Sequence, residues 1–311
     1  MGRDPNGKTP APVVSLPRTP MIAPLAPLRD RFVAVLFDLD GTLLDGEGRV
    51  TPRTRHAVRA LVDAGFEVLL CTGRSWHGTV ETHVALGLDT AIVAYNGEWI
   101  GRPDEAPWRY ATIPEPALDH VWHVESRALF SFRHNRGRKV SLVQDHPLQP
   151  RVADWFSGAV LVEHEHGLPG ADLMRVSCFF DAMGHAESAC SGMAEDVRST
   201  LRIETWPLAL FPEFADTGLQ MCEIQVKSRG KAEAFTYLEA ARGIPAARTI
   251  AVGDQNNDLT MLEGAGLAVG MANGTPEVHA RAHLVIGDHR EDGIAAWVEA
   301  GAPLDGEEGA C

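Results

Sequence analysis

Short apolar runs alternate with amphipathic segments in two parts of the chain, residues 30–97 and 222–303. The apolar runs are rich in branched residues and end at polar turns, which is typical of strands buried on both faces of a parallel sheet. The segments between them carry helix caps, such as Thr51 before Pro52. This alternation predicts right-handed βαβ units and a doubly wound α/β core, with strands expected at 32–37, 66–71, 90–95, 222–226, 248–252, 267–270 and 283–286.

The alternation breaks between residues 98 and 221, where short β-like runs such as 139–143 and 173–180 lie among helical or loop segments. We therefore expect an inserted α+β domain, which could cover a site in the core and exclude water from it. Residues 1–29 are rich in proline and poor in bulky apolar residues, so we expect a disordered leader there. Residues 304–311 are expected to form a frayed acidic tail.

Two aspartates, Asp38 and Asp40, follow the first expected strand and precede Gly41 and Thr42. Open α/β sheets bind their ligands at the carboxyl ends of the strands. Two carboxylates this close repel each other unless a cation lies between them, and a hard divalent cation such as Mg²⁺ prefers oxygen ligands. A carboxylate beside such a cation can attack phosphorus and carry the phosphoryl group covalently. For an isolated Asp-x-Asp the alternative interpretation is a turn cap.

A second polar turn, Thr72-Gly73-Arg74, follows the second expected strand. Its hydroxyl and backbone N–H groups can donate to phosphate oxygens, and Gly73 allows close approach. An isolated Thr-Gly-Arg is also typical of a plain strand-to-helix turn. Arg74 could contact a substrate or simply pair with an acidic neighbour.

Lys231 lies in the first turn of an expected helix. The helix dipole disfavours a cation at this end, so its presence favours a nearby anion such as phosphate. The alternative is an exposed helix lysine. The neighbouring Lys227 and Arg229 leave open which cation points inward.

The most specific local motif is Gly253-Asp254-Gln255-Asn256-Asn257-Asp258, directly after the strand expected at 248–252. Asp254 could face Asp38 across the sheet and complete a set of oxygen ligands for Mg²⁺. Asp258 could hold a metal-bound water or bind the ion directly, and Asn257 can donate to a phosphate oxygen. The alternative is a turn with helix N-caps, which the pairing with Asp38 and Asp40 disfavours.

Histidines and basic residues in the inserted segment carry weaker signals. Two histidine pairs, His120 with His123 and His164 with His166, lack a third ligand at a fixed spacing, so we interpret them as surface or core residues rather than a metal site. A short basic run is typical of a solvated face, although a surface turned toward an anionic substrate would have the same composition; it comprises Arg133, Arg136, Arg138 and Lys139.

Composition excludes several classes of protein. A net charge of −14 argues against a broad basic surface for nucleic acid. The five cysteines form no CxxC pair, which indicates neither a zinc site nor a disulfide framework. No apolar run approaches the roughly 18 residues of a membrane-spanning helix, and the N-terminus lacks the apolar core of a signal peptide. We expect a cytoplasmic protein with no nucleic-acid or membrane partner.

Four stretches in this order resemble the haloacid dehalogenase-like (HAD) phosphatases: Asp38-Leu39-Asp40-Gly41-Thr42, Thr72-Gly73-Arg74, Lys231-Ala232 and the motif from Gly253 to Asp258. The resemblance covers about residues 32–300, and the insertion after the third strand is similar to subfamily IIB, the Cof-like phosphatases with a C2B cap. It implies a Rossmann-like core, with the cap at 98–221.

The resemblance also implies roles for individual residues. Asp38 would be the nucleophile and Asp40 the general acid and base. The Mg²⁺ ligands would be Asp38, Asp40 through its backbone carbonyl, and Asp254, with Asp258 holding a water or binding directly. The phosphate-binding residues would be Thr72, Gly73, Lys231 and Asn257. For Arg74, contact with the substrate and pairing with an acidic neighbour both stay open.

Together these features predict a Mg²⁺-dependent phosphatase of small phosphorylated metabolites, with sugar phosphates as the default substrate. A phosphomutase or phosphotransferase with the same covalent step is the alternative, and a catalytically silent binding module is a third hypothesis. The oligomeric state and the residues that set specificity have no readable signal in the sequence.

Overall fold

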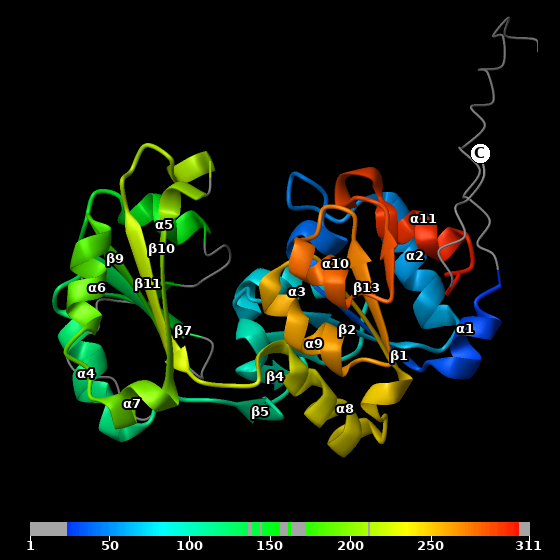
Figure 1. Cartoon of the computed structure of the whole chain (residues 1–311), viewed down its shortest axis with the longest axis horizontal. Helices are drawn as coiled ribbons and strands as arrows, with labels where there is room; N and C mark the ends of the chain where they lie inside the picture. Colours follow the sequence, from blue (N-terminus) through cyan, green and yellow to red (C-terminus); the bar gives the residue numbers. More distant parts are fainter. Residues whose placement is uncertain are drawn as a thin grey trace, which may run out of the picture.

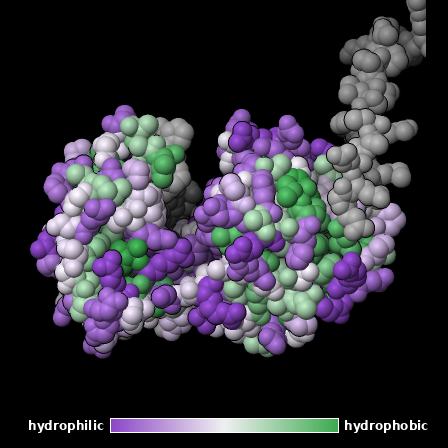
Figure 2. Space-filling view, viewed as in Figure 1, coloured by the Kyte–Doolittle hydropathy of each residue, from purple (hydrophilic) through white to green (hydrophobic). Residues whose placement is uncertain are grey.

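The computed structural model describes residues 24–135, 139–143, 145–155, 161–162, 172–210 and 212–304. The described chain forms two lobes, each built on its own sheet (Figure 1). Figure 2 shows hydrophilic residues interspersed with hydrophobic ones on the visible face of both lobes. Among the described residues, no helix is long and apolar enough to cross a membrane.

The larger sheet has eight strands and forms the core lobe. Its first six strands, from one edge, run parallel, and β4 and β5 then pair antiparallel at the other edge. In spatial order the strands are β14 (Leu284–Ile286), β13 (Leu267–Met271), β12 (Thr249–Gly253), β1 (Ala34–Phe37), β2 (Glu67–Cys71), β3 (Ile92–Ala94), β4 (Trp99–Gly101) and β5 (Arg109–Tyr110).

Helices cover both faces of this sheet because successive strand side chains point to opposite sides. In β1, Val35 and Phe37 belong to one buried cluster, whereas Ala34 and Leu36 belong to the other. The first cluster is closed by α1 (Ala26–Arg31), α2 (Pro52–Asp63) and α11 (Gly293–Glu299), and the second by α8 (Glu233–Arg242), α9 (Leu259–Gly264) and α10 (Pro276–Arg281). The doubly wound α/β core that the sequence predicted is confirmed, with α3 (Trp76–Ala85) joining β2 to β3.

The second lobe is built on a six-stranded sheet, antiparallel except for the pair β7 and β8. One face packs against α4 (Glu115–Glu125), α6 (Met183–Cys190) and α7 (Glu195–Thr200). The other carries an aromatic cluster around Phe130, Phe132 and Phe179, beside α5 (Gln149–Trp155). The strand order is β10 (Leu201–Pro207), β11 (Gln220–Val226), β9 (Leu173–Phe180), β6 (Phe130–Asn135), β7 (Lys139–Val143) and β8 (Leu161–Val162).

Sheet membership differs from the expected boundaries at both ends of the insertion. The strand expected to re-enter the main sheet at 222–226 is β11, which pairs with β9 and β10 in the second lobe. Conversely, β4 and β5 extend the core sheet beyond residue 98. The hydrophobic pattern could not reveal this, because a strand's partners depend on long-range pairing. We therefore propose that the inserted domain spans about residues 112–226 rather than 98–221.

The prediction of a disordered leader over residues 1–29 is wrong at its C-terminal end. The chain forms α1 from Ala26, with Pro27 in the first turn, where a missing N–H costs no hydrogen bond. Leu25 and Leu28 are buried, and both pack into the cluster that includes Phe32. Two leucines at this spacing are therefore enough to dock one helical turn, despite the proline content. Residues 1–23 and 305–311 lie outside the described chain.

Candidate active site

The carboxyl end of β1 places Asp38 at the edge of the core sheet. The Asp38 N–H donates to the carbonyl of Val252 in β12 over 3.0 Å, so the ladder between these strands ends at this residue. The chain then turns through η1 (Leu39–Leu43), where Gly41 has a φ of +78°. A Cβ on Gly41 would lie 2.3 Å from Oδ2 of Asp254, so glycine is required for Asp254 to approach the turn.

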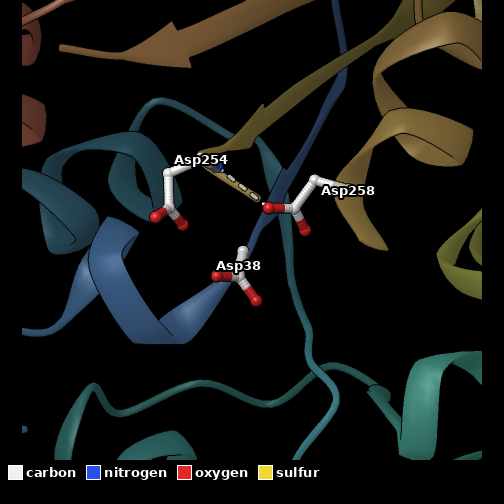
Figure 3. A group of neighbouring side chains, drawn as sticks. All are labelled: Asp38, Asp254 and Asp258. Atoms are coloured by element: carbon white, nitrogen blue, oxygen red, sulfur yellow. Dashed lines mark hydrogen bonds between the residues drawn. The ribbon is translucent and has the colours of Figure 1, made fainter. Parts of the chain in front are cut away.

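Three buried aspartates from two neighbouring strand ends converge here (Figure 3). Asp38 follows β1, whereas Asp254 and Asp258 follow β12. One carboxylate oxygen from each lies within 4.8 Å of the others. The expected approach of Asp254 to Asp38 is therefore present. Among the residues that the structure describes, this is the only group of three acidic, histidine or cysteine side chains close enough to hold a metal ion together.

Lys231 supplies the positive charge within this group. It lies in η5 (Gly230–Ala232), just before α8, and its side chain is fully buried. Its Nζ donates to Asp38 Oδ1 and, over 2.5 Å, to Asp258 Oδ1. Burial opposes the charge, but Asp258 and Asp38 outweigh it and raise the pKa of Lys231, so the lysine stays cationic. Lys227 and Arg229 are exposed, so Lys231 is the cation of this segment that points inward.

Asp258 is fixed by its own backbone neighbours. Its Oδ2 accepts from the N–H groups of Asp254 and Gln255, each over 2.9 Å (Figure 3 draws the first). A Cβ on Gly253 would lie 2.5 Å from the Asp258 carboxyl carbon, so glycine at the end of β12 makes room for this carboxylate. One Asp258 oxygen accepts from two N–H groups and the other accepts from Lys231, so Asp258 holds the lysine in this structure. Its part in metal binding stays a prediction.

Asp254 carries a polar support that the sequence did not single out. Its Oδ1 accepts from the Thr42 hydroxyl over 3.0 Å, and its Oδ2 accepts from the Asn273 amide over 3.3 Å. The Asn273 amide also donates to the Gly41 carbonyl over 2.8 Å, which ties the turn after β1 to the turn after β12. Burial is the main cause that raises the pKa of Asp254, to about 6.

A divalent cation fits this donor set. A single ammonium cannot neutralise three carboxylates, and burial followed by the charge of Asp258 raises the pKa of Asp38 well above its usual range despite Lys231. The free energy of such a group falls when a second cation binds between the carboxylates. Its atoms are all hard oxygens, which are the ligands that Mg²⁺ prefers. Asp38 and Asp254 are the side chains best placed to bind the ion.

Asp40 lies apart from the three buried aspartates and is bound by Arg74. The guanidinium donates from Nε to Oδ2 over 2.7 Å and from Nη2 to Oδ1 over 2.5 Å, in a bidentate pair. The Asp40 side chain is 58% exposed, so it is open to solvent, unlike the three buried aspartates. Of the two alternatives for Arg74, the structure shows the pairing with an acidic neighbour. The expected substrate contact stays a prediction.

The expected phosphate-binding residues after β2 and β12 lie side by side. A Cβ on Gly73 would lie 3.6 Å from Asn257 Nδ2 and 3.3 Å from Asn96 Oδ1, so the three residues meet around the missing side chain. The Asn257 amide donates to Asn96 Oδ1 over 3.2 Å. Thr72 is buried, and its hydroxyl accepts from the Arg74 N–H over 3.0 Å. Asn96 was not singled out, although its position after β3, at the same edge, was a usable signal.

The weaker signals have mixed outcomes. Arg133 is not on a solvated face, because it is buried and paired with Glu125 of α4. His120 and His123 lie on α4, where His120 is half-buried and His123 is exposed. His164, His166, Arg136 and Arg138 lie outside the described residues, as does the side chain of Lys139.

The fold and site define a doubly wound α/β protein with an aspartate cluster at the carboxyl edge of its sheet and a second lobe inserted after β5. Residues 35–298 match the model of the haloacid dehalogenase-like hydrolase family. The chain therefore belongs to the haloacid dehalogenase-like hydrolases, and the resemblance seen in the sequence motifs is confirmed.

The chain is also similar to individual proteins over most of its length. 5-Amino-6-(5-phospho-D-ribitylamino)uracil phosphatase YitU of Bacillus subtilis is 26% identical and covers 85% of this chain and 96% of its own. Pyridoxal phosphate phosphatase YbhA of Escherichia coli is 24% identical, with the same coverage of 85% and 96%. The solved structure of the HAD subclass IIB sugar phosphatase BT4131 has a TM-score of 0.66 at 20% identity, covering 85% of this chain and 96% of that one.

Proposed function

We propose that this protein is a Mg²⁺-dependent phosphatase that hydrolyses phosphate monoesters of small metabolites through an aspartyl-phosphate. The observation that carries the proposal is the group of three buried aspartates around one buried lysine, at the carboxyl edge of the sheet. Membership of the haloacid dehalogenase-like hydrolases supports it. The four described cysteines are buried and free, which supports the expected cytoplasmic location.

Asp38 is the proposed nucleophile. A carboxylate oxygen of Asp38 attacks phosphorus, the bond between phosphorus and the ester oxygen breaks, and the phosphoryl group is held as an acyl phosphate. Water then attacks phosphorus, the bond to Asp38 breaks, and inorganic phosphate leaves. Lys231 donates to Oδ1 of Asp38, so Oδ2 is the oxygen proposed to attack.

Asp40 is the proposed acid and base. In the first step it gives its proton to the departing ester oxygen, and in the second it takes a proton from the attacking water. Two of its features bear on this role. The side chain is exposed toward solvent, and Arg74 orients it by donating to both of its oxygens; one of these hydrogen bonds has to open when Asp40 carries the proton that it gives away. The guanidinium thereby limits the rotamers from which Asp40 can transfer a proton.

The phosphoryl oxygens are proposed to bind Thr72, the N–H of Gly73, Asn257 and Lys231, which supply donors from three neighbouring turns. Mg²⁺ would be held by Asp38, Asp254 and the backbone carbonyl of Asp40, with Asp258 close by; when bound, it would supply positive charge against the carboxylates and the phosphoryl group.

Small phosphorylated metabolites are the proposed substrates, with sugar phosphates as the first choice. YitU and YbhA are named for a phosphorylated ribitylamino-uracil and for pyridoxal phosphate, and BT4131 is named a sugar phosphatase. All three names refer to the hydrolysis of phosphate monoesters of small molecules. This shared chemistry supports small phosphate monoesters as the class of substrate, and rates of phosphate release rank the individual compounds.

The test is phosphate release from a panel of phosphorylated metabolites, with and without Mg²⁺, for the native protein and Asp38→Asn. We expect Mg²⁺-dependent release that falls by about a thousandfold or more in the variant. Asp63→Asn is a matched control, because Asp63 is an exposed carboxylate that pairs with Arg59 on α2. Acid-quenched protein should carry the phosphoryl group in the native form only.

Two results would contradict the proposal. Release that persists in Asp38→Asn would place the nucleophile elsewhere. Mg²⁺ binding without release, together with a phosphorylated product when sugars are added, would establish the phosphotransferase alternative instead, because a hydroxyl and not water then receives the phosphoryl group.

A further inference from the structure

The turn η2 (Tyr95–Gly97), after β3, has an unusual backbone. Tyr95 and Asn96 have φ values of 52° and 53°, so two consecutive residues with side chains lie in the left-handed region. This conformation is strained for residues that carry a side chain, and it persists only where the surroundings hold it. A contact that stabilises this turn therefore has an effect on whatever the turn itself positions.

The turn positions the proposed phosphate-binding residues. The Tyr95 N–H donates to the Arg74 carbonyl and the Asn96 N–H to the Thr72 carbonyl, each over 2.9 Å. The Asn96 side chain accepts from Asn257 over 3.2 Å. The same two residues thus join the turn after β2 to the turn after β12. If Tyr95 and Asn96 relaxed to ordinary φ values, these three hydrogen bonds could not all persist.

Tyr95 is held from both lobes. In the core it belongs to a buried cluster with Trp99 and is hydrogen-bonded to Ser75, and further contacts with its ring come from the second lobe. The Arg175 guanidinium, on β9, lies 5.0 Å from the centre of the Tyr95 ring. His134 of β6, which is paired with Arg175 across the sheet, packs its ring edge-on against Tyr95. Arg175 also contacts Glu98, one residue after the turn, with Nη2 3.5 Å from Oε2. Its own position is fixed within the lobe by Glu223, 3.0 Å away.

We propose that Arg175 is a positioning residue that couples the inserted lobe to the phosphate-binding turns. Its guanidinium packs against the Tyr95 ring, and the turn that contains Tyr95 and Asn96 orients Asn257. If the lobe moves away from the core, the guanidinium leaves the ring and the left-handed pair keeps only the support of the core residues. Productive phosphate binding then depends on the lobe being in place. This inference rests on the proposed function, because it assigns a use to the phosphate-binding residues.

Burial separates this role from direct recognition of a leaving group. Arg175 is 5% exposed and Tyr95 is 4% exposed, so neither offers a surface to a ligand in this arrangement. A positioning role predicts the same effect on every phosphate ester, whatever its leaving group. A leaving-group contact predicts an effect that varies with the ester.

Arg175→Lys is the first variant, since lysine keeps the charge beside Glu98 and Glu223 but loses the planar group that lies over the ring. Arg133→Lys is the matched control. Arg133 is equally buried in the same sheet, is paired with Glu125, and lies 4.5 Å from the Trp122 ring on the other face. Tyr95→Leu is a second variant, which removes the aromatic face without leaving a buried charge unpaired.

Turnover is measured with acetyl phosphate, whose leaving group is small, and with glucose 6-phosphate. We expect Arg175→Lys to lower kcat by about tenfold for both substrates, and Arg133→Lys to stay within about twofold of native. In an Asn257→Ala background, Arg175→Lys should have little further effect, because both changes act through one group. Full additivity of the two changes, or a change of KM for glucose 6-phosphate alone, would overturn the proposal.

Binding of inorganic phosphate with Mg²⁺ present, measured by calorimetry, separates this inference from the proposed function. If the native protein hydrolyses no substrate, the proposed phosphatase activity is contradicted, but phosphate binding can still be measured. We expect Arg175→Lys and Tyr95→Leu to weaken phosphate binding by about tenfold relative to Arg133→Lys. Equal affinities in all of these folded variants would refute the coupling.

Discussion

Lys231 lies fully buried with its ammonium 2.5 Å from Asp258 Oδ1 and in contact with Asp38. One buried cation therefore lies among three buried carboxylates, those of Asp38, Asp254 and Asp258. This arrangement makes the site a region of unbalanced negative charge inside the protein. Its consequences for stability can be measured without any substrate.

Replacing Lys231 by methionine should destabilise the fold strongly. Removal of one partner of a buried ion pair costs about 3–5 kcal/mol, and here two carboxylates lose their cation. Urea unfolding without Mg²⁺ measures the loss, and added Mg²⁺ should restore part of it by binding between the carboxylates. Lys227→Met is the control, since Lys227 is exposed and should change stability by less than about 0.5 kcal/mol. Equal stability of the two variants would contradict this assignment of charge.

Replacing Arg74 by lysine should lower kcat by about tenfold with little change in KM, because lysine cannot hold both oxygens of Asp40. The measurement is steady-state kinetics on esters with different leaving groups. If Arg74 instead contacts the substrate, KM will rise, and by different factors for different esters. The two results therefore decide between the pairing seen here and the substrate contact that the sequence left open.

Gly97→Ala should be far more harmful than an alanine at another left-handed glycine. Gly97 has a φ of +91°, and a Cβ there would lie 2.3 Å from the carbonyl oxygen of Gly230, next to Lys231. Gly87→Ala is the control, because Gly87 has a φ of +65° and open space around the added carbon. It should lose only about 1–2 kcal/mol, the usual penalty for a left-handed alanine. Thermal unfolding of both variants gives the comparison, and similar losses would be the contrary result.

Glu98 should make stability depend on pH. Burial raises its pKa from 4.5 to about 8, even though Arg175 opposes this effect, and its Oε1 has no hydrogen-bond partner among the described residues. The folded state therefore binds this proton more tightly than the unfolded state. The stabilisation is complete below about pH 4.5 and is lost as the pH rises through about 8.

The measurement is the difference in unfolding free energy between the native protein and Glu98→Gln. Relative to the variant, the native protein should lose stability between pH 5 and 8 with a slope approaching about 1.4 kcal/mol per pH unit. Three charged groups act on Glu98 and are the same in both proteins: Arg175, Glu223 and Arg202. A flat difference would mean that Glu98 is ionised in the folded protein throughout this range.

The sequence alone determined the strands of the core and the chemistry at their ends. Apolar runs bounded by polar turns placed β1, β2, β12 and β13 within one or two residues of their observed bounds. The motifs put Asp38, Thr72 and Asp254 directly after three of these strands. The carboxyl ends of parallel strands meet at one edge of the sheet, so local pattern was sufficient to predict that these residues converge.

Only the tertiary structure decided how distant parts of the chain combine. It placed β11 in the second lobe, paired Arg74 with Asp40, and brought Asn96 to Asn257 and Arg175 to Tyr95. Each of these contacts joins residues far apart in the sequence, and the polar partners have no periodicity that marks them. A strand's apolar pattern shows that it is buried, whereas its neighbours depend on which packing of the whole chain has the lowest free energy.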